Sequence, residues 1–174
     1  MSLNDYMEKG GFIMYILLAF SILGFTIVIW KFIVLQISKR KVKMISSDLL
    51  KSINEKIKNN ENPLYIELIN EEVEFKLLQL EKGLNTVRMI ATLSPLLGLL
   101  GTVIGIFDSF EQISKHNMDF SFFANGISLA LITTIGGLIV AIPHLIAYNY
   151  LIKTVDILEK IIKKNTLISI LGEK

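Results

Sequence analysis

Three long apolar stretches, separated by polar segments, set the pattern of this 174-residue chain. The first runs from Gly11 to Trp30 without a charged residue and continues past Lys31 toward Ile37. The others run from Met89 to Phe107 and from Phe120 to Ile152. A helix needs about 20 mostly apolar residues to cross the hydrocarbon core of a bilayer. The pattern therefore predicts three transmembrane helices, over residues 11–37, 89–110 and 120–152.

The polar segments predict the rest of the organisation. Residues 38–88 read as a helical connection with one break at Asn62-Pro63, because proline is poor inside a helix but good at its start. Residues 153–174 extend the third span as a C-terminal helix, and residues 1–174 form a single membrane domain. Lys and Arg accumulate after the first and third spans, whereas residues 108–119 hold three acidic residues against Lys115 and His116. The positive-inside rule therefore places the N-terminus outside and the connection and C-terminus in the cytoplasm.

Composition supports a membrane protein and gives no sign of an enzyme. The chain is 52% hydrophobic and its mean hydropathy is +0.54, which is too apolar for an ordinary soluble domain. The first ten residues lack the basic start of a signal peptide, so we expect the first helix to stay in the mature chain. With no cysteine and two distant histidines, we expect no metal site. The glycine-rich GLLGTVIG lacks the Lys-Ser or Lys-Thr of a nucleotide loop, so we expect no cofactor.

Small and weakly polar residues share one face on each of the last two spans. At about 100° per residue, these positions fall into one stripe per helix. Such faces allow close helix packing in lipid, and a membrane threonine often bonds the carbonyl four residues before it. The functional alternative is a shared cavity for water, protons or a polar group of a partner. The stripes are Ala91, Pro95, Gly98, Thr102, Gly105 and Ser109, and Gly126, Ala130, Thr133, Thr134, Gly137, Ala141 and His144.

Two of these stretches resemble the ExbB/TolQ/MotA family of bacterial proton-channel proteins: SPLLGLLGTVIGIFDSF, residues 94–110, and NGISLALITTIGGLIVAIPHLIAYNY, residues 125–150. The resemblance implies an all-α, multi-pass protein of the bacterial inner membrane, with a periplasmic N-terminus and a cytoplasmic C-terminus. It implies a ring-shaped homopentamer whose central pore holds the transmembrane helices of an ExbD- or TolR-like bitopic protein. Proton flow would then drive a TonB- or TolA-like protein. Three spans argue against the MotA branch, whose members have four.

The resemblance also assigns roles to individual residues. Thr102 and Thr134 match the pore threonines of the family, and Thr133, Gly98, Gly105 and Gly137 accompany them as expected pore-lining residues. Pro95 and Pro143 match prolines that bend these helices. His144 is the only histidine inside an uncharged apolar window, which makes it a candidate proton relay.

One position departs from the family pattern. Leu129 stands where ExbB- and TolQ-like relatives commonly carry an acidic residue, and neither of the last two apolar windows contains Asp or Glu. Because a buried carboxylate is the usual device of a membrane proton path, we expect the partner's transmembrane helix to supply it.

These observations predict an ExbB-like proton-channel subunit that energises TonB-dependent outer-membrane transport together with an ExbD/TolR-like partner. Two alternatives stay open: a TolQ-like subunit of the Tol-Pal envelope system, and a non-conducting scaffold for a bitopic partner. The bilayer, further copies of the chain and these proteins are the expected partners, and nucleic acid is not.

Overall fold

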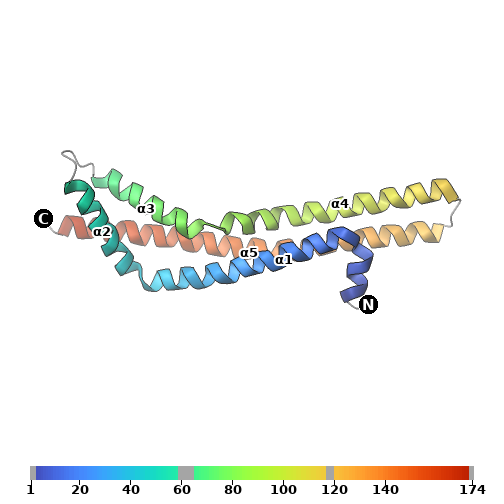
Figure 1. Cartoon of the computed structure of the whole chain (residues 1–174), viewed down its shortest axis with the longest axis horizontal. Helices are drawn as coiled ribbons and strands as arrows, with labels where there is room; N and C mark the ends of the chain where they lie inside the picture. Colours follow the sequence, from blue (N-terminus) through green and yellow to red (C-terminus); the bar gives the residue numbers. More distant parts are fainter. Residues whose placement is uncertain (1–2, 59–64, 117–119, 173–174) are drawn as a thin grey trace. The chain divides into compact units, whose positions relative to one another are not determined.

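The protein is all-helical in the computed structural model, which describes residues 3–58, 65–116 and 120–172. The expected break at Asn62-Pro63 lies outside the described residues. Among the described residues, three helices are long and apolar enough to cross a membrane, which agrees with the predicted number of candidate spans. The helices are α1 (Leu3–Arg40), α2 (Val42–Lys58), α3 (Tyr65–Glu81), α4 (Leu84–His116) and α5 (Phe120–Gly172) (Figure 1).

The candidate spans are longer than a bilayer requires. They cover Gly10–Arg40, Leu84–Ser114 and Gly126–Ile168, of 31, 31 and 43 residues. At 1.5 Å per residue even the shorter two reach about 46 Å, against about 30 Å of hydrocarbon. Each helix must therefore be tilted or continue beyond the apolar layer, as the length of the third apolar stretch predicted.

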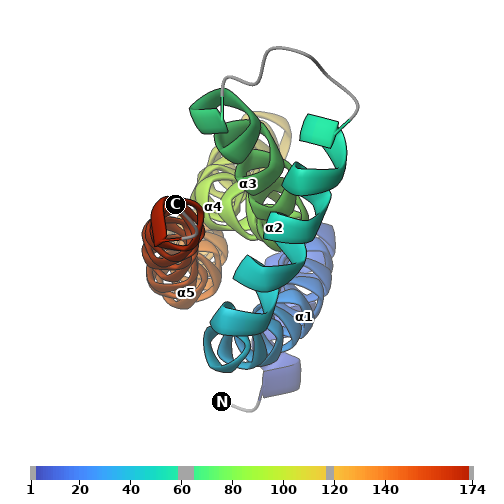
Figure 2. The same cartoon turned by 90° about the vertical axis from the view of Figure 1, so that its left-hand side faces the viewer.

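The chain divides into two compact units, and α1, α4 and α5 contribute to both. The first unit holds the chain up to Val28 together with Thr86–Tyr148, and the second holds Ile29–Asn85 together with Asn149–Lys174. In the first unit α1, α4 and α5 run alongside one another (Figure 1, Figure 2). Leu17, Ile90 and Val140, one from each helix, form its buried apolar cluster.

Contacts along the first unit fix the helix directions. Ser94 of α4 lies against Gly137 of α5, and Ser109, later in α4, lies against Gly126, earlier in α5. The two helices are therefore antiparallel. Met14 of α1 lies beside Gly136, and α1 continues in the same direction as α5. This up-down-up order is the one that three successive membrane crossings require.

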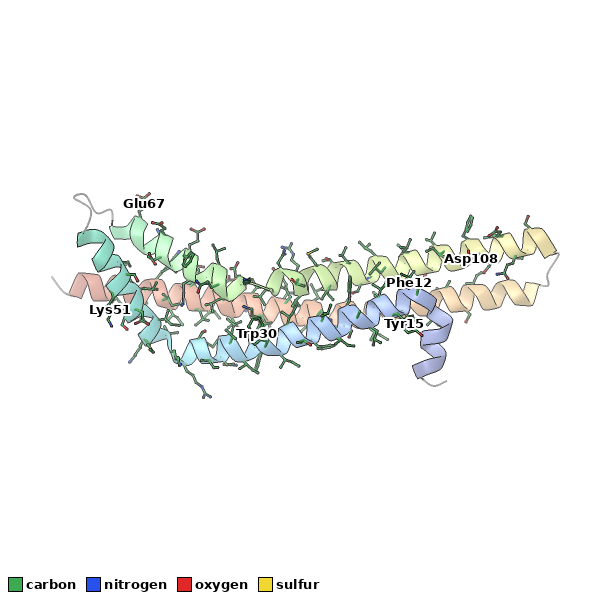
Figure 3. All side chains as sticks on the ribbon, in the orientation of Figure 1. Phe12, Tyr15, Trp30, Lys51, Glu67 and Asp108 are labelled. Carbon is green, nitrogen blue, oxygen red and sulfur yellow. The ribbon has the colours of Figure 1, made fainter. Side chains whose placement is uncertain are left out.

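A bend in α1 marks the start of its apolar stretch. Gly11 has φ 58° and ψ −154°, within an otherwise helical segment. Side chains strongly disfavour this conformation, so glycine is the residue that permits it. Phe12 follows directly after the bend (Figure 3). The sequence analysis did not single out Gly11 as a bend.

The second unit has its own apolar core and a buried lysine. Leu35, Ile53, Val73 and Leu158 are buried there, and α2 packs on α3. Lys31 of α1 is 3% exposed, and its Nζ donates to the carbonyl oxygens of Leu80 at 3.0 Å and Gln79 at 3.4 Å.

Lys31 therefore caps the C-terminus of α3. The last carbonyls of a helix have no partner within the helix and carry its negative dipole end, which a cation stabilises. α3 ends at Glu81 and is followed by Gly83 with φ 91°, the left-handed geometry that commonly terminates a helix.

Replacing Lys31 with methionine is expected to weaken the second unit. The apolar stem would be kept, but two carbonyls would lose a charged donor, a loss of about 1.5–3 kcal/mol for such a hydrogen bond. The free energy of unfolding in detergent would be compared with that of Lys39→Met, which changes an exposed lysine of the same helix. Equal destabilisation by the two substitutions would show that the cap contributes nothing.

Candidate functional site between helices α4 and α5

Glycine brings the backbones of α4 and α5 together. A Cβ atom on Gly98 would lie 2.7 Å from the carbonyl oxygen of Thr133, and one on Gly105 would lie 2.8 Å from the Cβ of Ala130. A Cβ on Gly137 would overlap the carbonyl oxygen of Ser94. The two small faces predicted from the sequence therefore face each other within one chain, as the close-packing alternative requires. Their role in lining a pore stays a prediction.

A group of threonine hydroxyls occupies this contact. The hydroxyls of Thr102 and Thr134 form a hydrogen bond in which either can be the donor. Thr102 can instead donate to the carbonyl oxygen of Ala130 at 3.0 Å, and Thr134 to that of Gly98 at 3.1 Å. Because each hydroxyl has one proton and accepts through two lone pairs, these bonds are alternatives among which the protons can switch.

Thr133 differs from the other two threonines in exposure. It is 4% exposed and donates to the carbonyl oxygen of Ala130 at 2.7 Å or of Gly98 at 3.0 Å. Thr102 and Thr134 are half-buried, at the edge of the helix contact. The carbonyl oxygen of Gly98 is thus within reach of all three hydroxyls, since Thr102 also approaches it at 3.3 Å. The pair at the edge is the part of this group that a partner or water can reach.

His144 lies apart from the threonines and is fully buried against α1. Its Nδ1 is 2.6 Å from the carbonyl oxygen of Val140, and its ring packs at 4.6 Å, tilted by 55°, on the ring of Phe25. Within the described part of the chain its Nε2 is buried without a hydrogen-bond partner. α1 covers the imidazole, which is fully buried in the single chain. Its relay role remains a prediction.

Gly24 makes room for this imidazole, a role that the sequence analysis missed. A Cβ on Gly24 would overlap Nε2 and Cδ2 of His144. Gly24→Ala is therefore expected to destabilise the packing of α1 by about 1–3 kcal/mol, the usual range for overpacking. The same substitution in a His144→Ala background should have a much smaller effect, because the obstructing ring is gone. A double-mutant cycle on unfolding free energies measures this coupling; additive effects would contradict the contact.

The remaining predicted positions are placed as follows. Pro95 and Pro143 lie inside α4 and α5, and both helices continue past them, so their bending role stays a prediction. Leu129 is in α5, but its side chain lies outside the described residues. Among the described residues, no three His, Cys, Asp or Glu side chains are arranged to hold a metal ion.

Comparison with known proteins gives this arrangement a family context. The sequence model of the MotA/TolQ/ExbB proton channel family matches residues 36–164. A putative biopolymer transport protein ExbB homolog of Methanothermobacter thermautotrophicus is 32% identical over 87% of this chain and 63% of its own length. Biopolymer transport protein ExbB of Helicobacter pylori is 44% identical over 48% of this chain and 58% of its own.

A third relative is similar along most of both chains. Putative biopolymer transport protein ExbB-like 1 of Helicobacter pylori is 29% identical over 86% of this chain and 85% of its own length. The chain spans less than two thirds of the length of the first two relatives, at 63% and 58%.

Proposed function

The chain belongs to the MotA/TolQ/ExbB proton channel family and is most like ExbB within it, and from this premise we propose that it is a subunit of a proton-conducting membrane complex. In this proposal it works with an ExbD/TolR-like bitopic partner and uses the proton motive force to energise TonB-dependent transport. A proton gains about 2.3 kcal/mol for each 100 mV of membrane potential, so one or two protons could drive a modest conformational step.

The observation that carries this proposal is the Thr102–Thr134 hydroxyl pair. It lies at the half-buried edge of two apolar helices and has several alternative acceptors within reach. In the membrane, hydroxyls that can reorient are able to orient water or a protonated group beside them. If the two hydroxyls served only helix packing, they would not need to remain half-buried at the edge of the contact.

The titrating carboxylate comes from the partner in this proposal. Residues 89–107 and 120–152 contain no Asp or Glu, and Leu129 occupies the position where relatives commonly have one. A proton path needs a group that exchanges protons near the middle of the bilayer. An acidic residue on the partner's transmembrane helix, placed beside the threonine pair, would complete the path.

The assembly we propose is a homopentameric ring in the bacterial inner membrane, with α4 and α5 around a central pore. Both helices expose large apolar side chains in the single chain, which lipid and neighbouring copies would cover. The N-terminus would be periplasmic, and residues 38–88 and 153–174 cytoplasmic. The exposed side chains include Leu96, Leu99, Val103 and Phe107 on α4 and Ile135, Ile139, Ile142 and Ile146 on α5.

Two other functions would use the same surfaces. A TolQ-like subunit would conduct protons but pass the work to a TolA-like protein of the Tol-Pal system. A scaffold would hold the bitopic partner through the glycine faces without conducting, which the absence of a carboxylate from these spans favours.

Replacement of the partner's membrane carboxylate by its amide tests this proposal. The complex would be reconstituted in liposomes, and proton uptake under an imposed potential would be followed with an internal pH dye. We expect uptake by the wild-type complex and at least a tenfold loss with the amide, since the site would lose its exchangeable proton. Unchanged uptake would refute an acid supplied in trans. Background uptake in both, from intact complexes, would favour the scaffold.

A further inference from the structure

A cavity of about 540 Å³ lies within the first unit, away from the exposed edge of the threonine pair. The segment around the bend of α1, including Ile13, forms one wall. On α4 the lining includes Ile104 and Asp108, and Thr133 of α5 contributes its polar side chain from the other side. The cavity is partly open to the surroundings. Asp108 is on α4, and Phe12, another lining residue, is beside the bend of α1 (Figure 3).

The cavity enters the predicted apolar layer from the end at which α4 becomes polar. Asp108 ends the apolar stretch of α4, and Gly101, which also lines the cavity, lies seven residues earlier. That separation is about 10 Å of helix. The cavity therefore extends from the charged end of α4 to the level of the threonine hydroxyls.

Glycine and the bend of α1 keep this space open. The conformation of Gly11 turns the first residues of α1 away from the direction of the rest of the helix. Gly101 and Gly105 contribute no side chain, and a Cβ on Gly101 would lie 2.5 Å from the Thr133 hydroxyl oxygen. Larger residues there would intrude on the contact beside the cavity.

The cavity has polar residues at both ends of a lining that is otherwise apolar or glycine, and it is large enough for water. A buried water needs about two to four polar partners and about 30 Å³ of liquid volume, so the cavity has room for well over ten. Asp108, Ser109 and Gln112 line the cavity toward one end and Thr133 toward the other. The Ser109 and Thr133 hydroxyls also donate to carbonyl oxygens of their own helices. A lipid chain filling the space would have to desolvate the Asp108 carboxylate without offering it a hydrogen bond.

We propose that this cavity is a water-filled route by which protons from the outer side reach the threonine layer within a single subunit. This inference rests on the proposed function, which sets the direction of proton flow along the route. The Asp108 carboxylate attracts cations, including hydronium, to the mouth. At the inner end Thr133 shares the Gly98 carbonyl with Thr134 and Thr102, so the water column ends beside the candidate site.

Single cysteines test the presence of water directly, because the chain has no cysteine of its own. Ile104→Cys would report on the cavity, and Val103→Cys is the matched control: it is the preceding residue, is 58% exposed and does not line the cavity. Each variant would be assembled with the bitopic partner in oriented vesicles. A membrane-impermeant cationic methanethiosulfonate would then be added on the outer side.

We expect the cysteine at position 104 to react at least tenfold faster than the one at position 103. Asp108→Asn should lower the ratio of cationic to anionic reagent rates at position 104 several-fold, since it removes the charge at the mouth. Similar rates at both positions would overturn the proposal. Reaction at position 104 with only a lipid-permeant maleimide would also overturn it, because the cavity would then have no aqueous access from the outer side.

Proton uptake by the same vesicles separates this inference from the proposed function. Labelling at position 104 should reduce uptake at least tenfold relative to the same vesicles before labelling. If position 104 is labelled and uptake does not change, the cavity is wet but is no route, and the proposed function stands. If the unlabelled complex shows no uptake, the proposed function and the route both fail, while the labelling still decides whether the cavity holds water.

Discussion

Gly137→Ala is expected to disrupt the packing of α4 against α5 and to prevent assembly of a stable complex. The added methyl group would overlap the backbone oxygen of Ser94, and Gly98 lies 3.2 Å from the same point. Backbone atoms cannot rotate away, so the helices must separate. Overpacking costs about 1–3 kcal/mol. Separation of the helices would also disturb the hydrogen bonds made by the hydroxyls of Thr102, Thr133 and Thr134. The measurement is the unfolding free energy in detergent together with the yield of assembled complex.

Gly136→Ala is the matched control for this prediction. It is the same substitution at the neighbouring position, but its nearest obstacle is the Met14 sulfur at 2.8 Å, near the end of a flexible side chain. Methionine adapts readily to such changes, so we expect less than 1 kcal/mol of destabilisation. If the two alanine variants were equally stable and assembled equally well, the close approach of α4 and α5 at Gly137 would not be a determinant of the fold.

The double substitution Thr102→Val and Thr134→Val is expected to reduce proton uptake by about ten- to a hundredfold while leaving the complex assembled. Valine keeps the shape of threonine but removes the hydroxyl. A hydrogen bond to a charged group contributes about 1.5–3 kcal/mol, and each 1.36 kcal/mol added to a barrier slows a step tenfold. Uptake by the purified complex in liposomes under an imposed potential is the measurement.

Two further variants make this prediction specific. Thr92→Val removes an exposed hydroxyl of α4. In the described part of the chain this hydroxyl donates to the carbonyl oxygens of Arg88 and Met89, which belong to the same helix. Uptake should therefore stay near the wild-type level. Replacement of both Thr102 and Thr134 by serine keeps the hydroxyls and should restore much of the uptake. Wild-type uptake by the double valine variant would exclude the pair from the proton path.

The helices were predictable from the sequence because they depend on local pattern. Three uncharged apolar stretches predicted three spans, and the spacing of small residues predicted which sides of α4 and α5 are able to approach closely. The bend at Gly11 was missed because a glycine near the end of an apolar stretch is equally compatible with a continuous helix. Only its φ of 58° in the folded chain distinguishes the two.

Contacts between distant segments were not predictable from one sequence. Lys31 looked like a single charge that interrupts an apolar stretch, and its function as a cap depends on carbonyls of residues 79 and 80. Gly24 and His144 likewise carry no sign of each other along the chain. The stripe that contained His144 placed it on the face of the threonines, but the fold buries its ring against α1.

The measurement that tests the central claim most directly is proton uptake by liposomes that contain this chain and its ExbD/TolR-like partner, compared with liposomes that contain either protein alone. The account predicts uptake that depends on the imposed potential and appears only when both proteins are present, because α4 and α5 provide the threonine pair and the partner provides the carboxylate. An intact complex with no uptake above that of protein-free liposomes would contradict a proton-conducting function.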